Sequence, residues 1–276
     1  MKWFTTKNVF MILLLMTILL VTLFIMVRPN YWTALTKSKD HFIEHSNNSR
    51  ILYEPNAKEY SDKIADYFPI ALNIIKEKQL KTFLKPFNVY VCNSQKSHNE
   101  YLGENIQFPI RGTSLRGDVY IAPSAFNFEG LDTHKETLKH ELSHLLFRQQ
   151  LGFFKYRKIP HWFHEGFGDY LAGSGGEGIK EENAINFILS GKHFIVQEEG
   201  EIFGSFPKVM NGISYRMFHK QAKMFVTFIV NSDSLSFNTF LQNIQEGNNF
   251  SKSFQEEMNM SISDMWTKFT NQLDSN

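Results

Sequence analysis

The longest apolar segment of the chain lies near its N-terminus. Residues 9–27 (VFMILLLMTILLVTLFIMV) carry no charge, and two threonines are their only polar members. As a helix that rises about 1.5 Å per residue, this segment matches the roughly 30 Å hydrocarbon thickness of a bilayer. Trp3 and Phe4 precede it, and Tyr31 and Trp32 follow it. The pattern predicts a transmembrane helix with aromatic anchors at both interfaces.

A cleaved signal peptide and a buried core helix are the two alternatives for this segment. A signal peptide usually has a shorter apolar region followed by small residues at the cleavage site, and residues 28–32 (RPNYW) contain no such site. An N-terminal tail as short as residues 1–8 usually stays in the cytoplasm. The numbers of basic residues before and after the apolar segment are nearly equal, so they add little to this inference. We therefore expect a single-pass membrane protein whose large domain lies outside the cytoplasm.

Residues 28–50 are polar and of mixed charge, which indicates a stalk between the membrane segment and a folded domain. The remaining residues, 51–276, suffice for one domain or two closely joined subdomains. The 27 phenylalanines of the chain supply ample volume for its core.

Within residues 51–276 most apolar residues recur at helical spacing. From residue 56 to residue 79 this spacing predicts a helix that Pro69 should kink or divide. Thr133 and Glu136 form a potential capping box for a second long helix, which should end near Gly152. Shorter helices are predicted over 160–171, 217–230, 235–245 and 261–273.

Two β-rich runs, 87–92 (FNVYVC) and 117–122 (GDVYIA), predict strands, and residues 97–116 between them predict a loop. The second strand is a candidate sheet edge with which a peptide could pair. A small sheet followed by helices gives an α+β fold class.

Charge and cysteine content exclude several classes of function. The formal net charge is +1, and no basic tract with interleaved aromatic residues is present, so nucleic acid is not an expected partner. Cys92 is the single cysteine, which excludes an intrachain disulfide and a zinc site made of cysteines.

The candidate chemistry begins at His140-Glu141-Leu142-Ser143-His144. Two histidines four residues apart lie on one face of a helix and can hold one zinc ion. Glu141 beside them can act on a water bound to that ion. A helix with solvated histidines is the alternative, because the motif arises by chance in roughly two per cent of such chains.

Glu165 is the candidate third ligand, on the helix that Pro160 opens. Asp169, one turn further on, could accept the free ring N–H of a zinc histidine, or it could be solvated or cap a neighbouring helix. His161 and His164 adjoin Glu165 and are alternative metal ligands, but we expect them to contact substrate or line the rim of the site. His193 and His219 have no spacing that supports a role.

These residues resemble a known family. His140-Glu-Leu-Ser-His144, followed by Pro160-x-Trp162-x-x-Glu165-Gly166-Phe167-x-x-Tyr170, is similar to the gluzincin zinc metallopeptidases, in particular to the small bacterial peptidase MA-like domains. The resemblance implies a zincin-like fold with a small N-terminal sheet, an active-site helix and a helical C-terminal subdomain. It also implies Zn²⁺ ligation by His140, His144 and Glu165, with Glu141 as general base and Asp169 as the carboxylate that holds a zinc histidine. Gly168 stands where these proteins more often have alanine.

The resemblance further suggests a tyrosine that stabilises the oxyanion, and Tyr215 is the candidate. Arg216 and His219 are alternatives for this role, and the Tyr215 ring could instead only pack.

The sequence thus predicts a membrane-anchored zinc metallopeptidase, which hydrolyses peptide bonds of a peptide or protein substrate with a zinc-activated water and Glu141 as general base. A zinc-stabilised, non-catalytic binding domain at the membrane surface is the alternative, and a structural domain without metal is a third possibility. No Gly-x-Met-x-Asn sequence of the kind that aminopeptidases use is present, which favours endopeptidase action.

Overall fold

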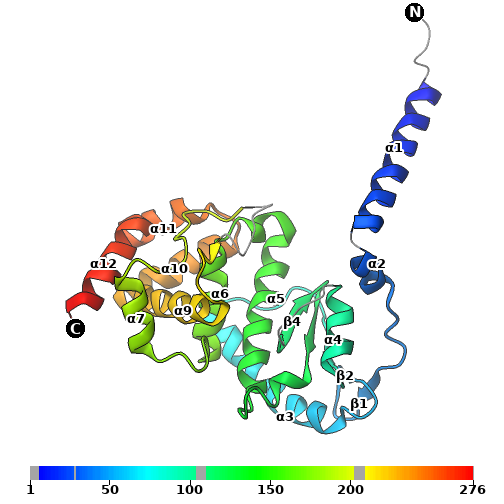
Figure 1. Cartoon of the computed structure of the whole chain (residues 1–276), viewed down its shortest axis with the longest axis horizontal. Coiled ribbons are helices and arrows are strands. Elements are labelled where there is room, and N and C mark those ends of the chain that lie inside the picture. Colours follow the sequence, from blue (N-terminus) through cyan, green and yellow to red (C-terminus); the bar gives the residue numbers. More distant parts are fainter. Residues whose placement is uncertain (1–5, 28, 104–109, 202–208, 276) are drawn as a thin grey trace, which may run out of the picture.

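The computed structural model describes residues 6–27, 29–103, 110–201 and 209–275, apart from the side chains of residues 23–31. A helical N-terminal arm leads into a domain in which a small sheet is followed by packed helices (Figure 1). The elements are α1 Thr6–Val27, α2 Pro29–Thr36, β1 Ile43–His45, β2 Asn48–Tyr53, α3 Lys58–Gln79, β3 Val89–Val91, α4 Gln95–Leu102, β4 Gly112–Leu115, β5 Asp118–Ile121, a 3-10 turn Pro123–Ala125, α5 His134–Arg157, α6 His161–Ala172, α7 Glu181–Leu189, α9 Tyr215–Ser232, α10 Ser234–Gln245, α11 Phe250–Met258 and α12 Ile262–Ser275. The α+β class is confirmed, and the arrangement agrees with the expected zincin-like fold.

The N-terminal apolar segment is helical, as α1, and projects away from the domain (Figure 1). Its large apolar side chains from residue 9 to residue 21 are exposed. Among the described residues, however, no helix combines the length and hydropathy of a membrane span. The predicted transmembrane helix over 9–27 is therefore not confirmed, and the side chains at its C-terminal end lie outside the described part of the chain.

The expected stalk is partly folded into the domain. Strands β1 and β2 form an antiparallel hairpin, and β2 pairs in parallel with β3. The hairpin begins at residue 43, so the domain extends further toward the N-terminus than the predicted boundary at residue 51. Only His45 and Ile51 of this hairpin are buried, which explains why its sequence resembles a polar linker.

The strand order of the sheet within the described residues is β1-β2-β3-β5-β4. Alternate residues face opposite sides, as strand geometry requires. Val89, Val91, Val119 and Ile121 belong to the main core, whereas Tyr90, Cys92 and Tyr120 pack with Phe42 and Tyr101 in a smaller aromatic cluster.

Both predicted strands are confirmed, as β3 and β5, but the expected loop 97–116 contains part of α4 and all of β4. Strand β4 pairs antiparallel with β5 and forms the edge of the sheet. The prediction that residues 117–122 form the edge is therefore wrong, because β4 covers β5. Its short sequence Gly-Thr-Ser-Leu has no hydrophobic alternation and gave no strand signal.

The two long helices largely match their predicted ranges. Helix α3 continues through Pro69, which neither divides nor ends it. In α5 the backbone leaves helical geometry at Gly152, whose φ is 66°, and becomes helical again up to Arg157. The predicted capping box at Thr133 does not form, because the Thr133 hydroxyl donates to the carbonyl of Ala125 instead.

The C-terminal helices enclose a core rich in phenylalanine and tryptophan. Helix α6 packs closely against α9, and a β-carbon at Gly166 would lie 2.6 Å from the carbonyl oxygen of Ala222. Glycine is therefore required at position 166 for this close packing. The predicted helices 217–230, 235–245 and 261–273 are confirmed as α9, α10 and α12, while α7 and α11 were not expected.

A buried histidine makes the fold sensitive to acid. His98 on α4 has no solvent-exposed surface, and burial lowers its pKa from 6.5 to about 4. The unfolded chain therefore binds an additional proton between these pH values, so the stabilisation is present above pH 6.5 and is lost as the pH falls toward 4. We expect urea unfolding of the metal-free protein to lose about 3 kcal/mol more over this window than unfolding of His98→Gln. If the free energy of unfolding depended on pH equally in the wild-type protein and in His98→Gln, this prediction would be contradicted.

Candidate metal centre

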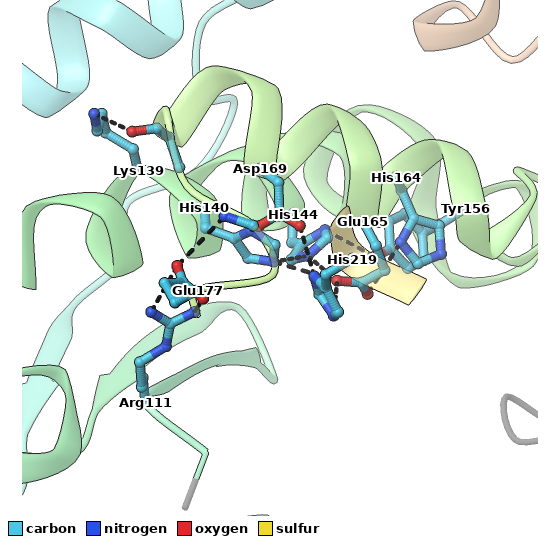
Figure 2. Close-up of polar contacts among 12 residues, drawn as sticks. Arg111, Lys139, His140, His144, Tyr156, His164, Glu165, Asp169, Glu177 and His219 are labelled. Atoms are coloured by element: carbon cyan, nitrogen blue, oxygen red, sulfur yellow. Dashed lines mark hydrogen bonds and ion pairs between the residues drawn. The ribbon is translucent and has the colours of Figure 1, made fainter. Parts of the chain in front are cut away.

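Two helices bring the predicted metal ligands together. His140 and His144 project from one face of α5, and Glu165 reaches them from α6 (Figure 2). The Oε2 atom of Glu165 lies 3.3 Å from Nε2 of His140 and 3.4 Å from Nε2 of His144. The two Nε2 atoms are 2.9 Å apart.

These separations fit the coordination of a divalent cation. Zinc bonds of about 2.0–2.1 Å at tetrahedral angles place neighbouring ligand atoms about 3.3–3.4 Å apart. The two distances to Glu165 match that value, and the histidine pair is slightly closer. His140, His144 and Glu165 thus form a group that could hold a metal ion.

The charge of Glu165 suits this role. Burial alone would raise the pKa of its carboxyl group, but the two histidines outweigh burial and hold the pKa well below its usual value. Glu165 is therefore ionised at neutral pH, as a metal-binding carboxylate must be.

Asp169 connects the candidate ligands to a third histidine. One carboxylate oxygen lies 3.0 Å from Nδ1 of His140, and the other lies 2.6 Å from Nδ1 of His219 on α9. Asp169 is 1% exposed, so it is neither solvated nor a helix cap at the surface. Its contact with Nδ1 of His140, whose Nε2 lies near Glu165, is the geometry that the role predicted for Asp169 requires.

Loss of this carboxylate should weaken metal binding without removing a ligand. We expect Asp169→Asn to lower the affinity for zinc about 10- to 100-fold, because the amide offers the His140 ring a weaker and less directional partner. Competition with a fluorescent chelator measures this change. An affinity equal to that of the wild-type protein would mean that Asp169 does not orient His140.

The glycine at position 168 also follows from this packing. A β-carbon there would lie 3.0 Å from Nδ1 of His140. Alanine at this position would therefore press on the ring of this candidate ligand unless the ring moved.

Glu141 lies beside the candidate ligands but is not one of them. Its Oε2 atom accepts a hydrogen bond of 2.7 Å from the backbone N–H of Ser114 in β4. Burial raises the pKa of its carboxyl group. A buried carboxylate with a raised pKa is well suited to accept a proton near neutral pH.

The edge of the sheet next to this site is occupied by side chains. The backbone of Ser114 donates to Glu141, and its carbonyl accepts from Arg148. The sheet edge at Ser114 is thus not available for pairing with a peptide in this structure.

A cavity of about 310 Å³ reaches the candidate centre at His140 and at the neighbouring Glu141. It is bounded by β4, α5, α6, the glycine-rich segment after α6 and the start of α9. Its lining residues are Ile110, Arg111, Gly112, Phe128, Thr137, His140, Glu141, Asp169, Ser174, Gly176, Glu177, Ser214, Tyr215, Arg216 and His219.

Tyr215, the predicted oxyanion residue, is the first residue of α9 and lines this cavity with 41% of its surface exposed. Arg216 pairs with Glu129 at the rim. His219, one turn beyond Tyr215, is 7% exposed and lies within the site. No sequence spacing links His219 to the metal motif, because it reaches Asp169 through tertiary packing across a sequence separation of 50 residues.

A second group, formed by His161, His164 and Glu165, could also hold a metal ion. Nδ1 of His164 lies 3.4 Å from Oε1 of Glu165, on the side away from His140 and His144 (Figure 2). The ring of His164 also stacks on Tyr156, at 5.1 Å between centroids. Burial is the main cause that lowers the pKa of His164 to about 4. The first group is the better candidate for a metal centre, because the cavity is lined by His140 of this group and by Glu141, and not by His161 or His164.

Comparisons with known proteins find a likeness in structure but not in sequence. No protein-family model matches the sequence, and no curated protein matches it. A solved structure with a similar course of the chain is that of yeast LTA4 hydrolase in complex with bestatin, at a TM-score of 0.48 and 10% identity. The alignment covers 85% of this chain but 38% of that chain.

Proposed function

We propose that this protein is a zinc-dependent metallopeptidase. The observation that carries the proposal is the meeting of His140, His144 and Glu165 at ligand distances, with Glu141 beside them and with His140 and Glu141 on the wall of a cavity. Two imidazoles and one carboxylate are a donor set that zinc prefers in catalytic sites, where a fourth position stays open.

The chain's own residues supply the proton transfers. When bound, zinc would polarise the scissile carbonyl and make water acidic enough to react near neutral pH. Glu141 takes a proton from the attacking water and then gives it to the leaving amine. Its Oε2 atom accepts a hydrogen bond from the backbone N–H of Ser114, so Oε1 is the oxygen that accepts the proton in this proposal.

Membrane anchoring through residues 9–27 is part of the proposal, with the catalytic domain outside the cytoplasm. The exposed apolar side chains of α1 support it, because a water-exposed surface of this kind is unfavourable unless lipid or protein covers it. Fractionation of cells that express the chain, followed by protease protection of the domain, tests both the anchoring and the orientation. If added protease digested the domain only after the cytoplasmic membrane had been lysed, the proposed orientation, with the domain outside the cytoplasm, would be contradicted.

The enzymatic proposal is tested with the purified full chain in detergent. We expect about one equivalent of zinc by elemental analysis, cleavage within a peptide library, loss of cleavage with a chelator and recovery when zinc is added back. Bound zinc without cleavage of any peptide would support the non-catalytic binding domain. Less than a tenth of an equivalent after purification with zinc would contradict both.

A further inference from the structure

The C-terminal end of α5 carries two exposed phenylalanines. Phe153 is 66% exposed and Phe154 is 67% exposed, the largest fractions for phenylalanine within the described part of the domain. Their rings pack edge to face on each other, with 5.3 Å between centroids. Exposed aromatic surface is unfavourable in water, and an apolar patch on a folded protein commonly marks a contact with a partner or a membrane.

The two phenylalanines follow a break in the helix at Gly152. The backbone there has a φ of 66° and a ψ of −179°, which only glycine adopts readily. A β-carbon at Gly152 would meet no atom within 4 Å, so the backbone conformation and not a lack of space requires glycine. Leu151 before the break is buried, whereas residues 153–155 after it are exposed. The break thus separates the core-facing part of α5 from an exposed end.

A third apolar side chain lies at the same end of the helix. Leu84 is 62% exposed. The backbone N–H groups of Leu84 and Lys85 donate to Oε1 of Gln149 on α5, over 2.8 and 2.9 Å. Gln149 precedes Phe153 by four residues, so these hydrogen bonds fix Leu84 beside the end of α5. We call Leu84, Phe153 and Phe154 the apolar tip.

Lysines flank the apolar tip. Lys85 follows Leu84 directly, and Lys155 and Lys158 follow Phe154. All three lysines are exposed, and none of them forms an ion pair with another described residue. An apolar centre with basic side chains around it is typical of protein surfaces that bind the boundary of an anionic membrane.

The acidic groups near this end of α5 have other partners. Glu199 lies near Lys158, because the backbone N–H of the following residue donates to the carbonyl of Lys158. The Glu199 carboxylate accepts a hydrogen bond of 2.8 Å from the backbone N–H of Ser251. Glu246 pairs with Lys81 at 3.0 Å. The three lysines beside the apolar tip therefore keep their charge for a partner outside the chain.

Helix α1 lies toward the same side of the molecule. In Figure 1 the C-terminal end of α5 is at the upper side of the domain, and α1 extends from α2 toward that side. A bilayer around α1 would therefore face the end of α5 that carries the apolar tip.

We propose that the apolar tip inserts into the surface of a membrane that contains anionic lipids. The inference rests on the membrane anchoring proposed above and not on the peptidase activity. The phenylalanines and Leu84 enter the boundary between head groups and acyl chains, and the three lysines bind the anionic head groups. A second copy of the chain would bring like charges together at this surface, whereas lipid phosphates complement them.

Docking of the apolar tip would fix the height of the candidate metal centre above the lipid. Gly152 lies eight positions after His144 on the same helix. At about 1.5 Å per residue, the separation along the helix axis is about 12 Å. The domain would then be held at two points, through α2 and through the apolar tip, with the candidate metal centre close to the membrane surface.

The experiment uses the full chain in vesicles of phosphatidylcholine and phosphatidylserine in equal parts, with a nitroxide on some of the lipids as a quencher. A fluorophore is attached to Phe154→Cys, because Cys92 is completely buried and does not compete for the label. Leu235→Cys is the matched control, at an apolar position that is 79% exposed and close to Asp233. We expect the label at position 154 to be quenched at least about fivefold more than the label at position 235.

Charge reversal tests the contribution of the lysines. One lysine near an anionic surface strengthens binding about fivefold, so Lys155→Glu combined with Lys158→Glu should weaken docking at least about 25-fold. Quenching at position 154 should fall accordingly. The control combines Lys180→Glu with Lys268→Glu, which gives the same net charge. These two exposed lysines lie beside α7 and on α12, away from the end of α5 (Figure 1), and their reversal should leave the quenching unchanged.

A chain that floats with the vesicles while position 154 is quenched no more than position 235 would overturn the docking and leave the anchoring intact. A chain that does not float with the vesicles would contradict both. Equal quenching in vesicles of phosphatidylcholine alone, or after reversal of Lys155 and Lys158, would overturn the selection of anionic lipid. A shift in the fluorescence at position 154 that depends on protein concentration and not on lipid would show that a second copy covers the apolar tip instead.

Discussion

Replacement of Glu141 by glutamine is expected to lower kcat/KM for peptide hydrolysis about 10²- to 10⁴-fold, while the protein keeps one zinc per chain. Glutamine has nearly the same shape, and its amide oxygen can still accept the hydrogen bond from the Ser114 backbone. It cannot accept a proton from water at neutral pH. Because Glu141 is not among the metal-binding group, the loss should appear in catalysis and not in zinc content.

Glu136→Gln is the matched control for this experiment. Glu136 lies on the same helix, in its first turn, and is not part of the cavity lining. We expect it to retain full activity. Activity that survives in Glu141→Gln would show that another group accepts the proton, and the assignment of Glu141 as general base would be abandoned.

Short-range geometry made part of this site predictable. His140, Glu141 and His144 lie within one helical turn, so the helix alone fixes how the two imidazoles are related. To assign Glu165 as the third ligand, one further inference was needed, namely that the helix of Glu165 (α6) packs beside the helix of the two histidines (α5). The structure brings these four residues together, with Asp169 one turn beyond Glu165.

His219 could not be assigned in the same way. Its position depends on how closely α9 packs against α6, which rests on the missing side chain at Gly166. The motif over residues 160–170 contains this glycine but does not tell which helix packs against it. Tyr215 was predicted as the oxyanion residue because it begins the helix. In the fold, His219, one turn later, is more deeply buried in the site.

The sheet shows the same limit on prediction. Strands β3 and β5 are central and buried, and their valines and isoleucines identified them. Strands β1, β2 and β4 are at or near the edges, where few side chains are buried, so hydrophobic alternation is weak. One of these missed strands, β4, supplies the backbone that holds Glu141.

His144→Gln is expected to weaken zinc binding by more than about 100-fold, since loss of a ligand should cost at least as much as loss of a group that orients one. In the presence of zinc, this loss should remove at least about 2.7 kcal/mol of metal-linked stabilisation, measured as a lower thermal midpoint that no longer responds to added zinc. The metal-free proteins should unfold at similar temperatures, which separates loss of the ligand from damage to the fold.

His164→Gln is the control that decides between the two candidate metal groups. His144 belongs only to the group with His140, and His164 belongs only to the group with His161, while Glu165 is common to both. Zinc bound at His140, His144 and Glu165 predicts that His164→Gln retains affinity within about threefold, because His164 contacts Tyr156 and Oε1 of Glu165, whereas Oε2 of Glu165 is the atom beside His140 and His144. The reverse result, with loss in His164→Gln and retention in His144→Gln, would place the metal at the second group. Glu141 would then no longer adjoin the metal, and the peptidase mechanism would lose its general base.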